Sequence, residues 1–121
     1  MFSGMAEKSL SELNEIVLAH RDERDWQQFH TPKELAVSLV VEATELLALM
    51  QWKTGQQLSE TLAAKRQDVA DELADVFHSL LLLASDLQIP LDAALLQKLR
   101  KDAEKYPVSK SRGKNLKYNE L

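Results

Sequence analysis

The stretch that decides the fold is residues 65–87, which read KRQDVADELADVFHSLLLLASDL. Its apolar side chains recur at intervals of three or four residues, as they do on one face of a helix. They are Val69, Leu73, Val76, Leu80, Leu83 and Leu87. Pro90 ends the pattern, because proline lacks the backbone N–H that a continuing helix needs. The stretch therefore predicts one long helix whose apolar face packs against other helices.

Three further segments are predicted to be helical: residues 9–24, 31–52 and 91–106. The second begins at Thr31, a good N-cap residue, followed by Pro32 at a position that suits proline. Residues 56–64 are expected to add a short helical turn. No stretch alternates with the period of two that is typical of strands. Four helices with short connections predict an all-α protein with a four-helix bundle-like protomer.

A length of 121 residues is that of one domain. We expect a flexible leader at residues 1–8, the helical domain at 9–106, and a polar, basic and extended tail at 107–121. The net charge of −4 argues against binding to a nucleic-acid polymer, which needs a basic surface. We also expect no membrane partner, because the longest apolar stretch is too short to span a bilayer. The lack of cysteine is compatible with a cytoplasmic location.

Four acids form two pairs at i, i+3 spacing, Glu42 with Glu45 and Glu72 with Asp75, on two of the predicted helices. Residues three apart share one face of a helix, so four carboxylates converge if these helices face each other. Carboxylates that converge repel one another unless a cation lies among them, and Mg²⁺ suits such oxygen ligands. A network in which lysine or arginine compensates the acids stays open as the alternative.

Aromatic residues gather in the connection that precedes the second helix, where residues 23–30 read ERDWQQFH. Trp26, Phe29 and His30 can plug the end of the bundle or form a wall on which a flat ligand stacks. Trp52 lies near the end of the following helix and could form an opposite wall. A base between aromatic walls, with its phosphates directed toward a metal, would make a nucleotide site.

Basic residues follow one face of the last predicted helix, at Lys98, Lys101 and Lys105. They can form a solvated face, or one or two of them can neutralise phosphate oxygens. His20 and His78 have no partner motif in the sequence and are interpreted as structural.

Taken together, these residues resemble the all-α nucleoside triphosphate pyrophosphohydrolases, the MazG-like superfamily, and more narrowly its dCTP pyrophosphatase branch. The superfamily signature is E-x-x-E followed after a gap by E-x-x-D, and residues 42–45 and 72–75 match it. The resemblance to the branch depends on further blocks, ERDWQQFH at 23–30, QWK at 51–53, KYP at 105–107, SRG at 111–113 and KY at 117–118. The blocks cover nearly the whole chain from about Leu10.

The resemblance implies a helical protomer that assembles into dimers, usually arranged as a tetramer. It implies that Glu42, Glu45, Glu72 and Asp75 hold Mg²⁺ and carry the catalysis. It implies a pyrimidine deoxynucleotide pocket with a phosphate contact at its far end, formed by Trp26, Gln27, Gln28, Phe29, His30, Trp52 and Lys98. The chain departs from some relatives at Ser79, where they carry tyrosine, and at Val17, where they carry histidine.

The function predicted on this basis is Mg²⁺-dependent hydrolysis of a (deoxy)nucleoside triphosphate, dCTP-like, to the monophosphate and pyrophosphate, which would cleanse the nucleotide pool. Water attacks the α-phosphorus, and an acid that the metal does not saturate, Glu45 or Asp75, takes the proton. Two alternatives stay open from the sequence. One is a non-catalytic helical interaction module, and the other is a related hydrolase that releases orthophosphate.

Overall fold

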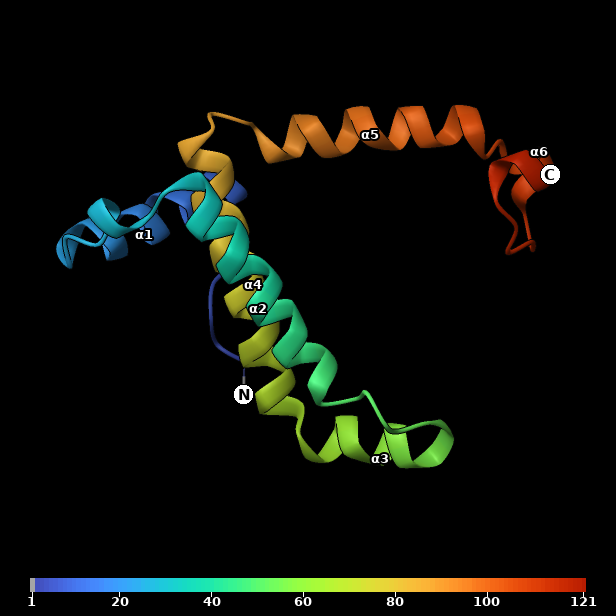
Figure 1. The fold of residues 1–121 in the computed structure, drawn as a ribbon, viewed down its shortest axis with the longest axis horizontal. Helices are drawn as coiled ribbons and strands as arrows, with labels where there is room; N and C mark the ends of the chain where they lie inside the picture. Colours follow the sequence, from blue (N-terminus) through green and yellow to red (C-terminus); the bar gives the residue numbers. More distant parts are fainter. Residues whose placement is uncertain (1) are drawn as a thin grey trace. The chain divides into compact units, whose positions relative to one another are not determined.

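The computed structural model describes residues 2–121, and these form six α-helices, two short 3₁₀ helices and no strand (Figure 1). The α-helices are α1 (Leu10–Glu23), α2 (Pro32–Ala48), α3 (Gly55–Ala64), α4 (Arg66–Asp86), α5 (Leu91–Lys105) and α6 (Val108–Ser111). The 3₁₀ helices are η1 (Gln27–Phe29) and η2 (Tyr118–Glu120). The predicted all-α class is confirmed. The chain divides into two compact units, one ending at Gln88 and the other beginning at Ile89, so the four-helix arrangement stays a prediction.

Side chains cap the first two long helices, and the cap at Thr31 is the predicted one. The Ser9 hydroxyl accepts the Glu12 N–H at 3.1 Å, and the Glu12 carboxylate accepts the Ser9 N–H at 3.1 Å. The Thr31 hydroxyl accepts the Glu34 N–H at 3.2 Å at the start of α2. Each cap gives a partner to an N–H that the helix itself leaves unpaired.

Two connecting segments differ from the prediction. Helix α2 ends at Ala48, earlier than the expected residue 52, because the next N–H groups bond to carbonyls three residues back and form turns. Residues 56–64, expected to add a short helical turn, belong to the ten-residue helix α3. Only Lys65 separates α3 from α4.

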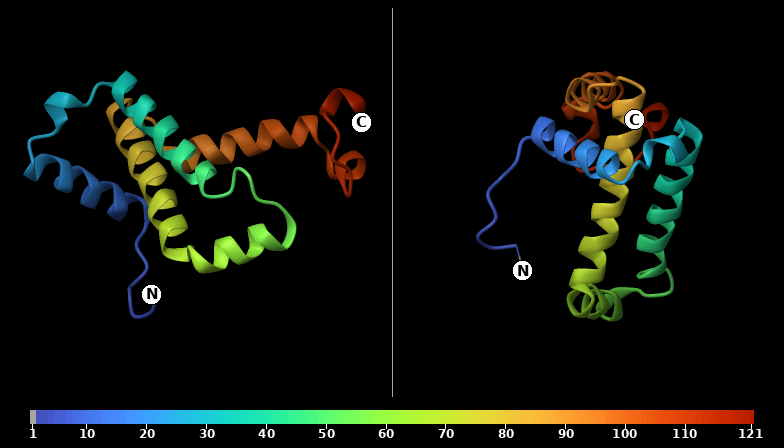
Figure 2. Two further views of the ribbon diagram at one scale, coloured as in Figure 1. Left: turned by 60° about the horizontal axis from the view of Figure 1, so that its bottom comes forward. Right: turned by 90° about the vertical axis from the view of Figure 1, so that its left-hand side faces the viewer.

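In the first unit α2 and α4 pack side by side, α1 packs against α4, and α3 touches α4 (Figure 2). The buried apolar residues among residues 2–121 are Leu35, Leu81, Leu82 and Ala84. This core lies where α4 meets α2 and α1. It holds these three helices in the positions from which they present the side chains of the site.

The predicted apolar stripe on α4 is only partly right. Leu73 is 53% exposed and Leu87 is 48% exposed, whereas Leu81 and Leu82, which lie off the predicted stripe, are buried. Residues 80–83 are all leucine, so this part of α4 is apolar on every side. Periodicity alone could not decide which side of such a segment packs within the chain.

The second unit consists of α5 and the C-terminal tail. The tail was expected to be extended, which is wrong in part, because residues after Pro107 form α6 and η2. The Tyr118 ring lies edge-on to Tyr106 with centroids 6.2 Å apart, and the Lys105 ammonium lies 5.1 Å from the centre of the Tyr118 ring. These contacts fold the end of the tail back onto the end of α5. Among the described residues, no single helix has both the length and the apolar content of a membrane span.

One ion pair joins α1 to α4. The Arg21 guanidinium donates two hydrogen bonds of 2.9 Å to the two carboxylate oxygens of Asp86. The Arg21 side chain is only 3% exposed and that of Asp86 only 18% exposed. The paired carboxylate also holds the pKa of Arg21 above its ordinary value. A bidentate pair of this kind fixes both the distance and the orientation of the two helices.

We expect Arg21→Ala to lower the free energy of unfolding by about 2–3 kcal/mol, because it leaves the Asp86 carboxylate partly buried without its partner. Urea unfolding followed by far-UV circular dichroism measures this change. Glu23→Ala is the control, since it removes the exposed neighbouring pair with Arg24, and it should cost less than about 1 kcal/mol. Equal losses of unfolding free energy in the two variants would contradict a stabilising role for the pair between Arg21 and Asp86.

Candidate active site

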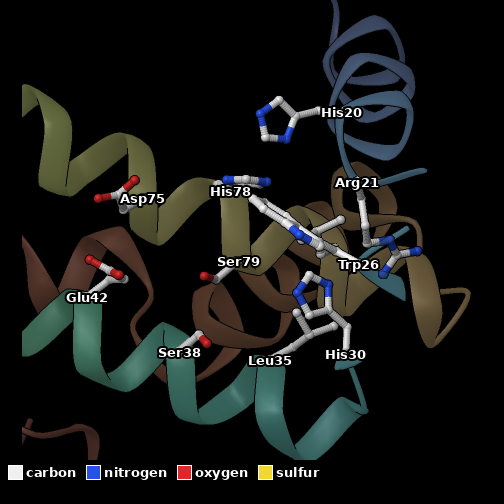
Figure 3. Close-up of a pocket in the computed structure, with 11 residues that line it drawn as sticks. His20, Arg21, Trp26, His30, Leu35, Ser38, Glu42, Asp75, His78 and Ser79 are labelled. Atoms are coloured by element: carbon white, nitrogen blue, oxygen red, sulfur yellow. The ribbon is translucent and has the colours of Figure 1, made fainter. Parts of the chain in front are cut away.

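The four predicted acids lie on the facing sides of α2 and α4. Glu42, Glu45 and Glu72 each direct one carboxylate oxygen into a cluster in which these oxygens lie within 4.8 Å of one another. Asp75, one turn beyond Glu72 on α4, faces Glu42 across the space between the two helices (Figure 3). The i, i+3 spacing thus brings both acid pairs to one place, as the sequence predicted.

The electrostatics of the cluster show how costly this arrangement is without a cation. Burial together with the neighbouring Glu45 carboxylate raises the pKa of Glu42 to about 7. Burial and the Glu45 charge also raise the pKa of Glu72 above its ordinary value. Crowded and partly desolvated carboxylates hold protons more tightly, because ionising one of them places a negative charge beside others.

Residues 2–121 supply no compensating cation to these acids. Glu42 Oε2 and Glu72 Oε2 are buried without a hydrogen-bond partner, and no ion pair between described residues involves any of the four acids. Within the chain this disfavours the alternative of a lysine or arginine network. Carboxylate oxygens with unused lone pairs are the donors that a hard divalent cation takes, so the residues present fit Mg²⁺.

A pocket of about 170 Å³ opens beside the acid cluster and lies entirely within the first unit. Glu42 and Asp75 stand at one end of it, and Trp26, His30 and Leu35 at the other (Figure 3). Its remaining lining residues are His20, Arg21, Ser38, His78, Ser79 and Leu82. The pocket therefore joins an acidic end to an aromatic end, which is the arrangement expected for a ligand with one flat part and one anionic part.

The Trp26 ring reaches the pocket because of a tight turn after α1. Asp25 adopts a positive φ of 52°, which aspartate tolerates better than most residues. The Gln28 side-chain amide donates to the Asp25 carbonyl and carboxylate, each at 3.0 Å. The Trp26 N–H donates to the Arg21 carbonyl at 3.2 Å. The polar residues of the connection thus hold the turn and present Trp26 to the pocket.

The remaining predicted substrate contacts are not all brought together. Phe29 and Trp52 are 66% and 85% exposed and do not line the pocket. Gln27 also lies outside the lining, in η1. Lys98 belongs to the second unit, where its ammonium is bonded to Asp102. The parts that Gln27, Phe29, Trp52 and Lys98 play toward a substrate stay predictions.

Sequence reasoning missed two lining residues, His20 and His78, which it interpreted as structural. His78 follows Asp75 by three residues and therefore lies one turn further along the same face of α4. The i, i+3 rule that identified the acids could have identified His78 as well. His20 could not be found in this way, because it comes from α1 and reaches the pocket only through the packing of α1 against α4.

Acids of two facing helices beside a half-aromatic pocket are side chains of the kinds that metal-dependent phosphate hydrolases use. Residues 37–121 match the model of the MazG-like family. The dCTP pyrophosphatase 1 proteins of Bos taurus and Homo sapiens are each 35% identical over 122 residues, covering 99% of this chain and 72% of the relative. The crystal structure of a pyrophosphatase from Archaeoglobus fulgidus is similar with a TM-score of 0.78 and 36% identity, covering 85% of this chain and 96% of that chain.

The chain belongs to the MazG-like family. The resemblance inferred from the residues is thereby confirmed, and with it the prediction of an enzyme of the pyrophosphohydrolase class. The comparisons do not assign individual residues, so the roles of the site residues depend on the geometry described above.

The raised pKa of Glu42 predicts how stability changes with pH when divalent cations are absent. A carboxyl whose pKa rises from 4.5 to about 7 on folding contributes stability that is present below pH 4.5 and is lost as the pH rises through 7. We therefore expect the stability of Glu42→Gln relative to wild type to increase with pH. At pH 8 the variant should melt roughly a few degrees higher than wild type, and at pH 4.5 this advantage should be lost.

Thermal unfolding in EDTA, followed by circular dichroism between pH 4.5 and pH 8, measures this difference. Glu34→Gln is the matched control, because Glu34 lies in the exposed first turn of the same helix. It should follow the wild-type pH dependence. Parallel curves for wild type and Glu42→Gln would show that the acid cluster does not destabilise the metal-free protein.

Proposed function

We propose that this protein hydrolyses a deoxynucleoside triphosphate, dCTP-like, to the monophosphate and pyrophosphate in a Mg²⁺-dependent reaction. The observation that carries the proposal is one pocket with carboxylates of α2 and α4 at one end and Trp26 at the other. The names of the relatives, dCTP pyrophosphatase 1, support the choice of substrate.

The acids would hold the cation. Glu42 and Glu72 each offer a buried oxygen without a partner, Glu45 contributes a third oxygen within the same cluster, and Asp75 stands one turn further along α4. When bound, a divalent cation neutralises the crowded carboxylates, polarises phosphate oxygens and stabilises charge on the pyrophosphate leaving group. The raised pKa of Glu42 means that the cation and protons compete for this site.

The proton of the attacking water would go to an acid that the cation does not saturate. Glu45 and Asp75 are the candidates, because both residues are exposed to water and Asp75 lines the pocket. Water attacks the α-phosphorus, the bond to the β-phosphate oxygen breaks, and pyrophosphate leaves. A carboxylate within reach of the water lowers the barrier by accepting its proton as the new bond forms.

The aromatic end would hold the base. Trp26 is 43% exposed, so one part of its ring stays available for stacking. A pocket of about 170 Å³ is close to the cavity of about 150 Å³ that holds benzene in another protein, so it suits a single six-membered ring. This supports a pyrimidine base over a purine. Phe29, Gln27, Gln28, Trp52 and Lys98 are proposed as outer contacts of the same substrate.

We further propose that the protein works as a homo-oligomer, a dimer or a dimer of dimers, in the cytoplasm. Large apolar side chains of α2 and α4 stay exposed in the first unit, among them Val40 at 65%, Leu47 at 55% and Leu73 at 53%. In a monomer these side chains would face water. A second copy that covers them would add the core that the first unit lacks.

Product analysis with Mg²⁺ tests the proposed reaction. We expect wild type to release pyrophosphate and monophosphate from dCTP, and Glu72→Gln to reduce kcat by a factor on the order of 10²–10³, because a ligand of the cation is lost. Glu34→Gln is the matched control and should keep its activity, since its side chain lies on α2 away from the cluster. Release of orthophosphate, or full activity of Glu72→Gln, would contradict the proposal.

Sedimentation equilibrium tests the oligomer. We expect wild type to sediment as a dimer or tetramer and Val40→Glu to shift toward the monomer, because a charge would be buried in the covered apolar surface. Lys33→Glu introduces the same charge at a side chain that is 84% exposed near the start of the same helix, and it should leave the assembly unchanged. A wild-type monomer at micromolar concentration would refute this proposal.

A further inference from the structure

The chain contains three histidines, and all three line the pocket that holds Trp26. His20 comes from α1, His30 follows η1, and His78 comes from α4. They therefore reach one place from three separate elements. A role in the site was predicted for His30 alone, so His20 and His78 need an explanation of their own.

The rings of His20, His78 and Trp26 form one connected set (Figure 3). The His20 ring meets Trp26 edge to face at 5.9 Å between centroids, and it meets His78 edge to face at 5.8 Å. Edge-to-face contacts of this kind restrict how far each ring can turn. His20 thus connects the Trp26 wall to His78, and His78 is held at a defined position along the side of the pocket.

Buried side-chain atoms without a hydrogen-bond partner, among the described residues, divide into two groups. Two are carboxylate oxygens of the acid cluster, on Glu42 and Glu72. Three are nitrogens that belong to pocket-lining residues, namely Arg21 Nε, His30 Nδ1 and His78 Nε2. Buried polar atoms are rarely left unpaired unless a ligand or water completes them. The oxygens fit a cation, and the nitrogens fit the polar edge of a base.

His78 is the best placed of these nitrogens to distinguish one base from another. It lies one turn of α4 beyond Asp75, between the acidic end of the pocket and the Trp26 end. Burial and the neighbouring His20 lower its pKa, so its imidazole stays neutral at physiological pH. A neutral imidazole donates from one nitrogen and accepts at the other, so it can pair with a carbonyl or an amino group of a base.

We propose that His78 is a specificity-determining residue, whose Nε2 hydrogen-bonds the polar edge of a pyrimidine base stacked on Trp26. This inference rests on the proposed nucleoside triphosphate hydrolysis and adds the residue that reads the base. Because the unpaired atom is a ring nitrogen that can donate or accept, His78 serves cytosine and its carbonyl-bearing analogues alike. The space beside Trp26 would then set the size of the base, and His78 would hold its polar edge.

Two variants separate the hydrogen bond from the ring. His78→Phe keeps an aromatic ring against His20 and removes both nitrogens, whereas His78→Gln restores an amide near the position of Nε2. Each is compared with wild type on dCTP, on dTTP and on deoxyribose 5′-triphosphate without a base, with Mg²⁺ and pyrophosphate detection. The substrate without a base keeps every phosphate and metal interaction, so it is an internal control for the acidic end of the site.

For His78→Phe we expect KM for dCTP and dTTP to rise roughly three- to tenfold, the loss of one hydrogen bond, with kcat within about twofold of wild type. The kinetics on the substrate without a base should not change, and His78→Gln should recover part of the loss. Equal losses on substrates with and without a base would place His78 at the phosphates and overturn the proposal.

An unchanged KM for both pyrimidine substrates in His78→Phe would also overturn it. If the phenylalanine variant melts well below wild type, the glutamine variant decides, since it must then change KM for dCTP and dTTP while leaving the kinetics on the substrate without a base unchanged. A wild-type protein that releases no pyrophosphate from any of the substrates would overturn the proposed function and this inference together. Wild-type kinetics in both residue 78 variants would overturn the role of His78 alone.

Discussion

The repulsion among the carboxylates of Glu42, Glu45 and Glu72 is the constraint on which the rest of the structure depends. Packing between α2 and α4 forces these acids together, although Glu42 and Glu72 would ionise more easily apart. A chain optimised only for stability would not keep them there, because nearby apolar or uncharged side chains would pack at lower cost. The cluster is therefore best understood as a site whose stability is completed from outside the chain, by a cation and by the anionic ligand that the cation attracts.

The sequence was sufficient to predict the acid cluster because the signal is local. A spacing of three residues fixes which side chains share a helix face, and Glu42 lies within the same partly buried stripe as Leu39 and Leu46. The helix boundaries were predicted for the same reason, since caps and proline act within one turn. The end of α2 and the fold of the tail were less predictable. They depend on turns and on contacts such as that between Tyr106 and Tyr118, which are specified by neighbours in space.

Other parts of the site are not encoded locally at all. His20 contacts His78 because α1 packs against α4, and the pair that joins these helices, Arg21 with Asp86, is 65 positions apart in the chain. The burial pattern of α4 has a similar origin, because its leucine-rich half is apolar on every side and its surroundings select the side that packs. Where several faces of a helix are equally apolar, no periodicity can rank them. The aromatic end of the pocket therefore had to be found in three dimensions.

Arg21 belongs to two structures at once. Its side chain clamps one helix to another, while its backbone carbonyl accepts the N–H of Trp26 and its own buried surface forms part of the pocket wall. One residue thus serves both the helix packing and the pocket wall. A substitution of Arg21 would therefore change the stability of the fold and the binding of the ligand together. Lineages that exchange their preferred nucleotide would need to rebuild that junction as a whole, and the anionic end, anchored on separate helical turns, could stay as it is.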